Sequence, residues 1–158
     1  VLFGHSDGAT ISLIAGAKYP ERISAIVSEA AHVFVEDITI EGIKSAVDQF
    51  KTHNLKQRLS KYHADKTDLL FRLWYETWLS KGFRNWNILD LLPQISCPVL
   101  VVQGENDEFG SMRQVSAITD RIKGRAESFI IPEVGHSPHK EATEKCLGKC
   151  AEFIKRNL

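Results

Sequence analysis

The first eight residues constrain the fold more than any other stretch of the chain. Val1–Phe3 are apolar, Gly4–Gly8 follow the pattern Gly-x-Ser-x-Gly, and apolar residues then recur at helical spacing. This order is typical of a sharp turn from a strand into a helix, where glycines avoid steric clashes and the serine hydroxyl is exposed. It predicts a parallel α/β sheet with Ser6 at the carboxyl end of a strand.

Further strands and helices follow this turn. The first helix is expected to end before Pro20, which bars its continuation. Apolar or β-branched runs predict three more strands, at residues 22–28, 99–102 and 128–132. Between the last two strands we expect a helix capped by Ser111 and closed by Gly124, and the chain is expected to end in an amphipathic helix. The predicted fold class is therefore α/β with four parallel strands.

Residues 33–92 have a different pattern, with apolar side chains at helical spacing in three segments. The three tryptophans, Trp74, Trp78 and Trp86, all fall here. They are expected to form the core of a helical subdomain. The alternative is that Trp74 and Trp78 line an apolar substrate pocket, because aromatic side chains dominate such walls. We therefore expect an α/β core at residues 1–32 and 93–158 and a helical cap at 33–92.

Composition disfavours several classes of protein. The 20 Lys and Arg residues balance 20 Asp and Glu residues, and there is no basic cluster, so nucleic-acid binding is not expected. No stretch approaches the ~20 apolar residues of a membrane helix, and no signal peptide is recognisable, so we expect no membrane association and a cytoplasmic location. Cys97, Cys146 and Cys150 are expected to be buried thiols, since a metal site at the last two would need further ligands.

Three polar residues lie just past the carboxyl ends of predicted strands: Ser6, Asp107 and His136. In open α/β sheets this edge is where ligands bind. A histidine can take the proton of a serine hydroxyl, and a carboxylate can hold the imidazole and stabilise its charged form. The sequence therefore predicts Ser6 as nucleophile, His136 as base and Asp107 as acid.

Other residues compete for these roles. Glu105 and Glu108 flank Asp107, and Glu29 follows the second strand; all three are expected to be solvated or structural. His139 is a rival base, although it lies near a helix start and not at a strand exit.

The remaining histidines, His5, His32, His53 and His63, are expected to pack or to lie on the surface. His32 is also a candidate to approach the substrate pocket from the hinge of the cap.

The order Ser, Asp, His along the chain is that of the α/β-hydrolases, and the chain resembles the C-terminal half or more of one that carries a helical cap. The matching segments are residues 4–8, 97–107 and 134–136. Ser6–Gly8 and Ile40–Ile43 are similar to biphenyl-hydrolase-like and valacyclovir-hydrolase-like enzymes. Because the chain begins in mid-strand without Met, we expect it to be the C-terminal portion of a longer protein whose first strands are missing.

The resemblance implies a serine hydrolase that cleaves a small-molecule ester through an acyl-serine intermediate, with no cofactor and no metal. A thioesterase or a carbon–carbon bond hydrolase would use the same triad, and a non-catalytic binding protein is the competing class. The backbone N–H of Asp7 is expected to be one oxyanion donor, and the second would come from a loop before Val1.

The Asp7 side chain has two interpretations: a carboxylate favoured by the helix N-terminus, or a partner for a cationic amino group of the substrate. The exposed first strand is expected to pair with the missing half or with a second copy of the chain.

Overall fold

A computed structural model describes all 158 residues of the chain, which form two compact units. The first unit comprises Val1–Phe34 and Asn87–Leu158, and the second comprises Val35–Trp86. The sequence placed the end of the helical cap at residue 92, whereas the second unit ends at Trp86. The chain re-enters the first unit here because the N–H of Ile88 donates to the carbonyl of Val33 and Asn87 forms an antiparallel bridge with Phe34.

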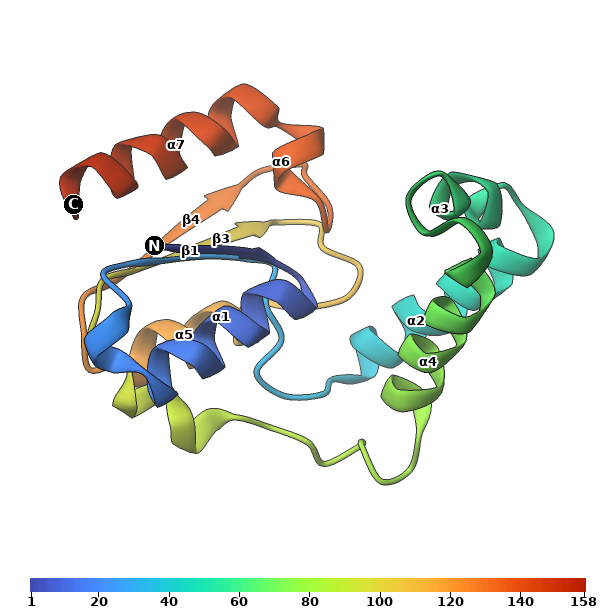
Figure 1. Cartoon of the computed structure of the whole chain (residues 1–158), viewed down its shortest axis with the longest axis horizontal. Coiled ribbons are helices and arrows are strands. Elements are labelled where there is room, and N and C mark those ends of the chain that lie inside the picture. Colours follow the sequence, from blue (N-terminus) through green and yellow to red (C-terminus); the bar gives the residue numbers. More distant parts are fainter. The chain divides into compact units, whose positions relative to one another are not determined.

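A parallel sheet of four strands forms the centre of the first unit, in the order β1-β2-β3-β4 (Figure 1). The strands are β1 (Leu2–His5), β2 (Ile26–Glu29), β3 (Val99–Gly104) and β4 (Ala126–Ile131). Every neighbouring pair is parallel. All residues of β2 and β3 are buried, as expected of strands that are covered on both faces. The predicted α/β class with four parallel strands is confirmed.

The second strand begins later than the sequence indicated. Residues 22–28 were expected to form it, but Pro20–Arg22 form a short 3-10 turn (η1) and β2 starts only at Ile26. Proline at the first position fixes a φ angle that suits such a turn, so the chain needs a few residues more to become extended.

The helix before β4 also ends differently from the prediction. Ser111 caps its start as expected, since its hydroxyl accepts the N–H of Arg113. The helix ends at Arg121, however, and Gly124 does not close it. A Cβ atom at Gly124 would lie 2.6 Å from the carbonyl oxygens of Ser96 and Cys97, so this glycine allows two backbone segments to approach each other.

Helices cover both faces of the sheet (Figure 1). One face carries α1 (Asp7–Lys18), α5 (Met112–Arg121) and the 3-10 helix η3 (Leu89–Gln94); the other carries α6 (Pro138–Glu141) and α7 (Thr143–Arg156). Cys146, Cys150 and Phe153 of α7 pack against buried residues of β2 and β3. All three cysteines are free and buried, as predicted.

The second unit is helical. It contains α2 (Asp37–Thr52), α3 (Leu55–His63), the 3-10 turn η2 (Ala64–Lys66) and α4 (Thr67–Leu79). Within it, the Phe50 and Phe71 rings stack with centroids 3.9 Å apart, and Trp78 packs edge-on against Phe83 and Trp86. No helix in either unit has both the length and the apolar character that a membrane crossing needs.

Candidate active site

Ser6 lies on the turn that joins β1 to α1. Its φ of 55° and ψ of −122° are unusual for a residue with a side chain, and the N–H of Ser6 donates to the carbonyl of Glu29 at 2.9 Å. A Cβ atom at Gly4 would lie 2.2 Å from the carbonyl oxygen of Gly8, so the first glycine is what lets α1 approach β1. Gly8 itself has no such neighbour within 4 Å, so its hydrogen side chain is not required by this contact.

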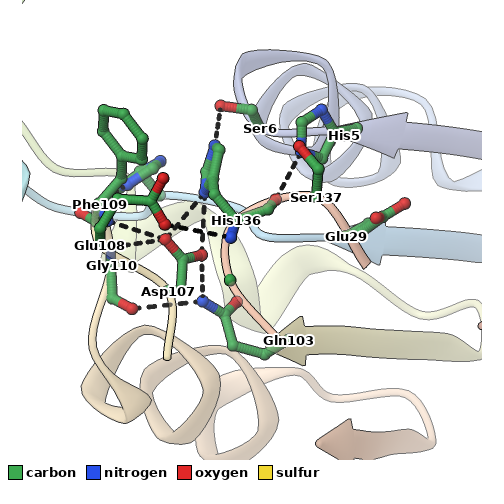
Figure 2. A network of polar contacts seen from close by, with 12 residues as sticks. His5, Ser6, Glu29, Gln103, Asp107, Glu108, Phe109, Gly110, His136 and Ser137 are labelled. Atoms are coloured by element: carbon green, nitrogen blue, oxygen red, sulfur yellow. Dashed lines mark hydrogen bonds and ion pairs between the residues drawn. The ribbon is translucent and has the colours of Figure 1, made fainter. Parts of the chain in front are cut away.

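His136 follows β4 and contacts both other residues of the predicted triad (Figure 2). Its Nε2 lies 2.9 Å from Oγ of Ser6, and its Nδ1 lies 2.9 Å from both carboxylate oxygens of Asp107. The Asp107 side chain is only 1% exposed. The three residues, 130 positions apart at the extremes, thus form a continuous hydrogen-bonded chain from carboxylate to hydroxyl.

The Asp107 carboxylate is compensated for its burial by several donors. Oδ1 accepts the N–H of Phe109 at 2.8 Å and that of Gly110 at 3.3 Å, and Oδ2 accepts the Nε2 amide of Gln103 at 2.6 Å. Gln103 also donates to the carbonyl of Gly110. Sequence reasoning missed Gln103, although a polar side chain at the end of the apolar run 99–102 was a signal for it.

The neighbouring glutamates contact main-chain atoms of the histidine turn and not the imidazole ring. Glu108 accepts the N–H of His136 at 3.2 Å, and Glu105 accepts the N–H of Glu133 at 3.3 Å. Glu141, which the sequence did not single out, accepts the N–H of Gly135 at 2.7 Å and of Ser137 at 2.9 Å. These carboxylates shape the turn that presents His136.

His32 lies close to this group. It is 4% exposed, its Nε2 is 3.0 Å from the carbonyl of Phe109, and its ring centroid is 5.9 Å from that of His136. Burial lowers its pKa below the ordinary value of 6.5, with the hydrogen bond to Phe109 opposing this in part. His32 is therefore neutral at pH 7. It lies in the same compact unit as Ser6.

The other predicted binding residues have different environments. Asp7 is exposed and is the first residue of α1. Trp74 and Trp78 lie in the second unit. Trp78 is only 6% exposed and packs against Phe83 and Trp86, so its ring is part of the aromatic core of that unit. Trp74 is half-buried beside Phe71.

One group of side chains outside the triad has the composition of a metal site. His5, Glu29 and His139 place possible ligand atoms within 4.8 Å of one another. Glu29 is fully buried, which excludes the solvated environment that was one of its two expected states. Its Oε1 accepts two hydrogen bonds from His139.

Proteins of known sequence that are similar to this chain include serine hydrolases. No family model matches the chain. The serine hydrolase BPHL of Homo sapiens is 32% identical over 163 residues, which cover 97% of this chain and 54% of the relative. BPHL of Mus musculus is 30% identical over 170 residues, with the same coverages. The chain thus spans about half the length of the curated relatives that it matches.

Solved structures support the fold assignment. The carbazole-degradation serine hydrolase CarC matches with a TM-score of 0.73 at 23% identity, covering 97% of this chain and 62% of that one. The meta-cleavage product hydrolase CumD of Pseudomonas fluorescens has a TM-score of 0.69 at 20% identity, and the proline iminopeptidase of Mycobacterium smegmatis has 0.69 at 15%. Each of these last two matches covers 98% of this chain and 64% of the other.

Proposed function

Because this chain has the fold of the α/β-hydrolase superfamily, we propose that it carries the catalytic triad of a serine hydrolase that cleaves a small-molecule ester. The observation that supports this most directly is the hydrogen-bonded chain of Asp107, His136 and Ser6, with Nε2 of the histidine 2.9 Å from the serine Oγ. A nucleophile and a base within hydrogen-bond distance, and a third group that orients the base, are what acyl transfer requires.

The geometry suggests the following reaction. Oγ of Ser6 attacks the ester carbonyl while Nε2 of His136 takes its proton. Asp107 accepts the hydrogen bond from Nδ1–H of His136 and stabilises the imidazolium that forms. The imidazolium then gives the proton to the leaving alcohol, which leaves an acyl-serine. Water, activated by the same Nε2, hydrolyses this intermediate and restores the serine.

Charge develops on the carbonyl oxygen during each attack. The N–H of Asp7 follows the nucleophile directly at the start of α1, where backbone N–H groups have no intrahelical acceptor. We assign it as one oxyanion donor, a role worth ~3 kcal/mol in transition-state stabilisation.

The test of this function is labelling with a fluorophosphonate probe, which reacts with activated serines. Purified protein is expected to be labelled, and Ser6→Ala is expected to abolish labelling while circular dichroism stays unchanged. A folded sample that remains unlabelled would instead favour a non-catalytic binding protein. A panel of matched esters, thioesters and carbon–carbon cleavage substrates then separates the three activities that one triad can support.

We also propose that the Asp7 carboxylate binds a cationic amino group of the substrate, because it is exposed and adjacent to the nucleophile. Asp7→Asn keeps the backbone N–H and removes only the charge. With ester pairs that differ in an α-amino group, kcat/KM for the amino ester is expected to fall ~10-fold or more, as for loss of a charge-assisted contact, while the neutral ester is unaffected. Equal losses on both esters would exclude this role.

A further inference from the structure

Glu29 is a fully buried charged residue that the proposed triad does not use. It ends β2, is 0% exposed, and its Oε1 accepts both the backbone N–H and the Nδ1–H of His139, each at 2.8 Å. Its other carboxylate oxygen, Oε2, has no partner. Burial of a carboxylate with one unpaired oxygen is costly to the free energy of folding. We therefore expect the Glu29 carboxylate to have a function other than stabilising the fold.

Glu29 contacts two segments that carry predicted catalytic residues. Its carbonyl accepts the N–H of Ser6 at 2.9 Å. Its side chain holds His139, which lies in α6, three residues after His136. One residue at the end of β2 is thus bonded to the nucleophile turn through its main chain and to the segment that follows His136 through its carboxylate.

His5 completes the contact with the base. Its Nε2 lies 2.7 Å from the carbonyl oxygen of His136, to which it donates, and its ring centroid lies 4.9 Å from that of His139 in an edge-on arrangement (Figure 2 shows His5, Glu29 and His136). Burial lowers the pKa of His5, so its ring is a neutral donor at pH 7. His5 therefore bonds the backbone of His136 while Asp107 bonds its ring.

We propose that Glu29 is a positioning residue that acts through His139 and, together with His5, holds the main chain of His136 so that Nε2 stays in line with Ser6. The proposal rests on the serine hydrolase function proposed above. A displacement of ~1 Å between base and nucleophile is enough to lower a rate about 100-fold.

Two substitutions of Glu29 test whether the hydrogen bonds that it accepts, and not its negative charge, position His136. Glu29→Leu has a similar volume but no acceptor, and it is expected to lower kcat 10- to 100-fold with KM nearly unchanged, as a displacement of ~1 Å would. Only a small loss of thermal stability is expected, because the two N–H groups of His139 lose their acceptor. Glu29→Gln keeps an oxygen for the two N–H groups of His139 and is expected to restore most of kcat. Loss of kcat in Glu29→Leu only in step with unfolding would show a purely structural role and overturn the proposal.

A double substitution tests whether Glu29 acts through His139. If it does, Glu29→Leu combined with His139→Leu lowers kcat no further than the larger single effect, because both changes release the same segment. Additive losses would mean that the two residues act independently. The downfield NMR signal of the His136 Nδ1 proton gives a direct readout: it is expected to shift or broaden in Glu29→Leu and to be retained in Glu29→Gln.

The outcomes distinguish this proposal from the general function. Absence of fluorophosphonate labelling in the unsubstituted protein refutes the hydrolase, whereas labelling together with an unchanged kcat in Glu29→Leu refutes only the positioning role. Treatment with a chelator is a further test, since His5, Glu29 and His139 are also possible ligands of a metal ion. Activity that EDTA leaves intact supports the hydrogen-bonded network, and activity that EDTA removes and Zn²⁺ restores would replace it with a metal site.

Discussion

At the scale of single residues, the acid of the proposed triad is distinguished from its neighbours by what surrounds its carboxylate. Asp107 is buried and bonds the imidazole, whereas Glu105 bonds a backbone N–H near the surface. Asp107→Asn is expected to lower kcat about 10⁴-fold because the amide favours the wrong tautomer of His136. Glu105→Gln, the same chemical change two residues away, is expected to leave kcat within experimental error, and steady-state kinetics on one ester compares the two.

Two histidines make stability depend on pH. His5 and His32 both have a lowered pKa in the folded protein, mainly because of burial, so the unfolded chain binds protons first as the pH falls through the ordinary value of 6.5. The free energy of unfolding is therefore expected to decrease as pH falls from about 7.5 to about 5.5, and to level off once both states are protonated. Urea unfolding at the two pH values measures this, and His32→Gln is expected to show a smaller decrease.

The cysteines are predicted to be chemically inert. Burial and the nearby Glu29 raise the pKa of Cys146 to about 12, and burial raises the pKa of Cys97 and Cys150. Thiolate is the reactive form, so Ellman's reagent at about pH 8 is expected to modify none of the three in the native protein and all three in denaturant. Rapid modification of a native thiol would contradict the burial.

At the scale of elements, the first turn depends on the close packing of α1 on β1. Gly4→Ala would place a methyl group 2.2 Å from the carbonyl of Gly8, and is expected to destabilise the protein by ~2 kcal/mol or more, as strained core substitutions do. Gly148 lies inside α7, where an added Cβ atom would have no neighbour within 4 Å, so Gly148→Ala is expected to stabilise by ~0.5–1 kcal/mol. Thermal unfolding of both variants gives the comparison.

Elements were predictable from local pattern where a single periodicity or cap dominates. The Ser111 cap and the apolar run that begins at Val99 have such signals, and the start of the helix and the strand both form as expected. The start of β2 was not predictable in the same way, because Arg22–Ser24 are as compatible with a turn as with a strand. The start of β2 is decided by its pairing with β3, because the first paired residues are Ile26 of β2 and Val99 of β3.

At the scale of the whole molecule, β1 is an edge strand of the sheet and pairs only with β2. Phe3 is 45% exposed and Val1 48%. An edge strand with free backbone N–H and C=O groups tends to pair with another chain. We therefore propose that β1 pairs either with the rest of a longer protein or, where residues 1–158 stand alone, with a second copy of the chain. Analytical ultracentrifugation is expected to show concentration-dependent dimers that Phe3→Lys weakens, and dimers unaffected by this charge would place the contact elsewhere.

The sequence by itself determined the parallel α/β class, the buried thiols and the order of Ser6, Asp107 and His136, because each follows from a pattern within a few residues. Only the tertiary structure decided which side chains meet. Gln103 reaches the acid, and Glu29 reaches His139 over 110 positions, because sheet register brings the carboxyl ends of separate strands together. A buried glutamate and a solvated one have the same letter in the sequence, and their difference in environment arises only when the strands pair.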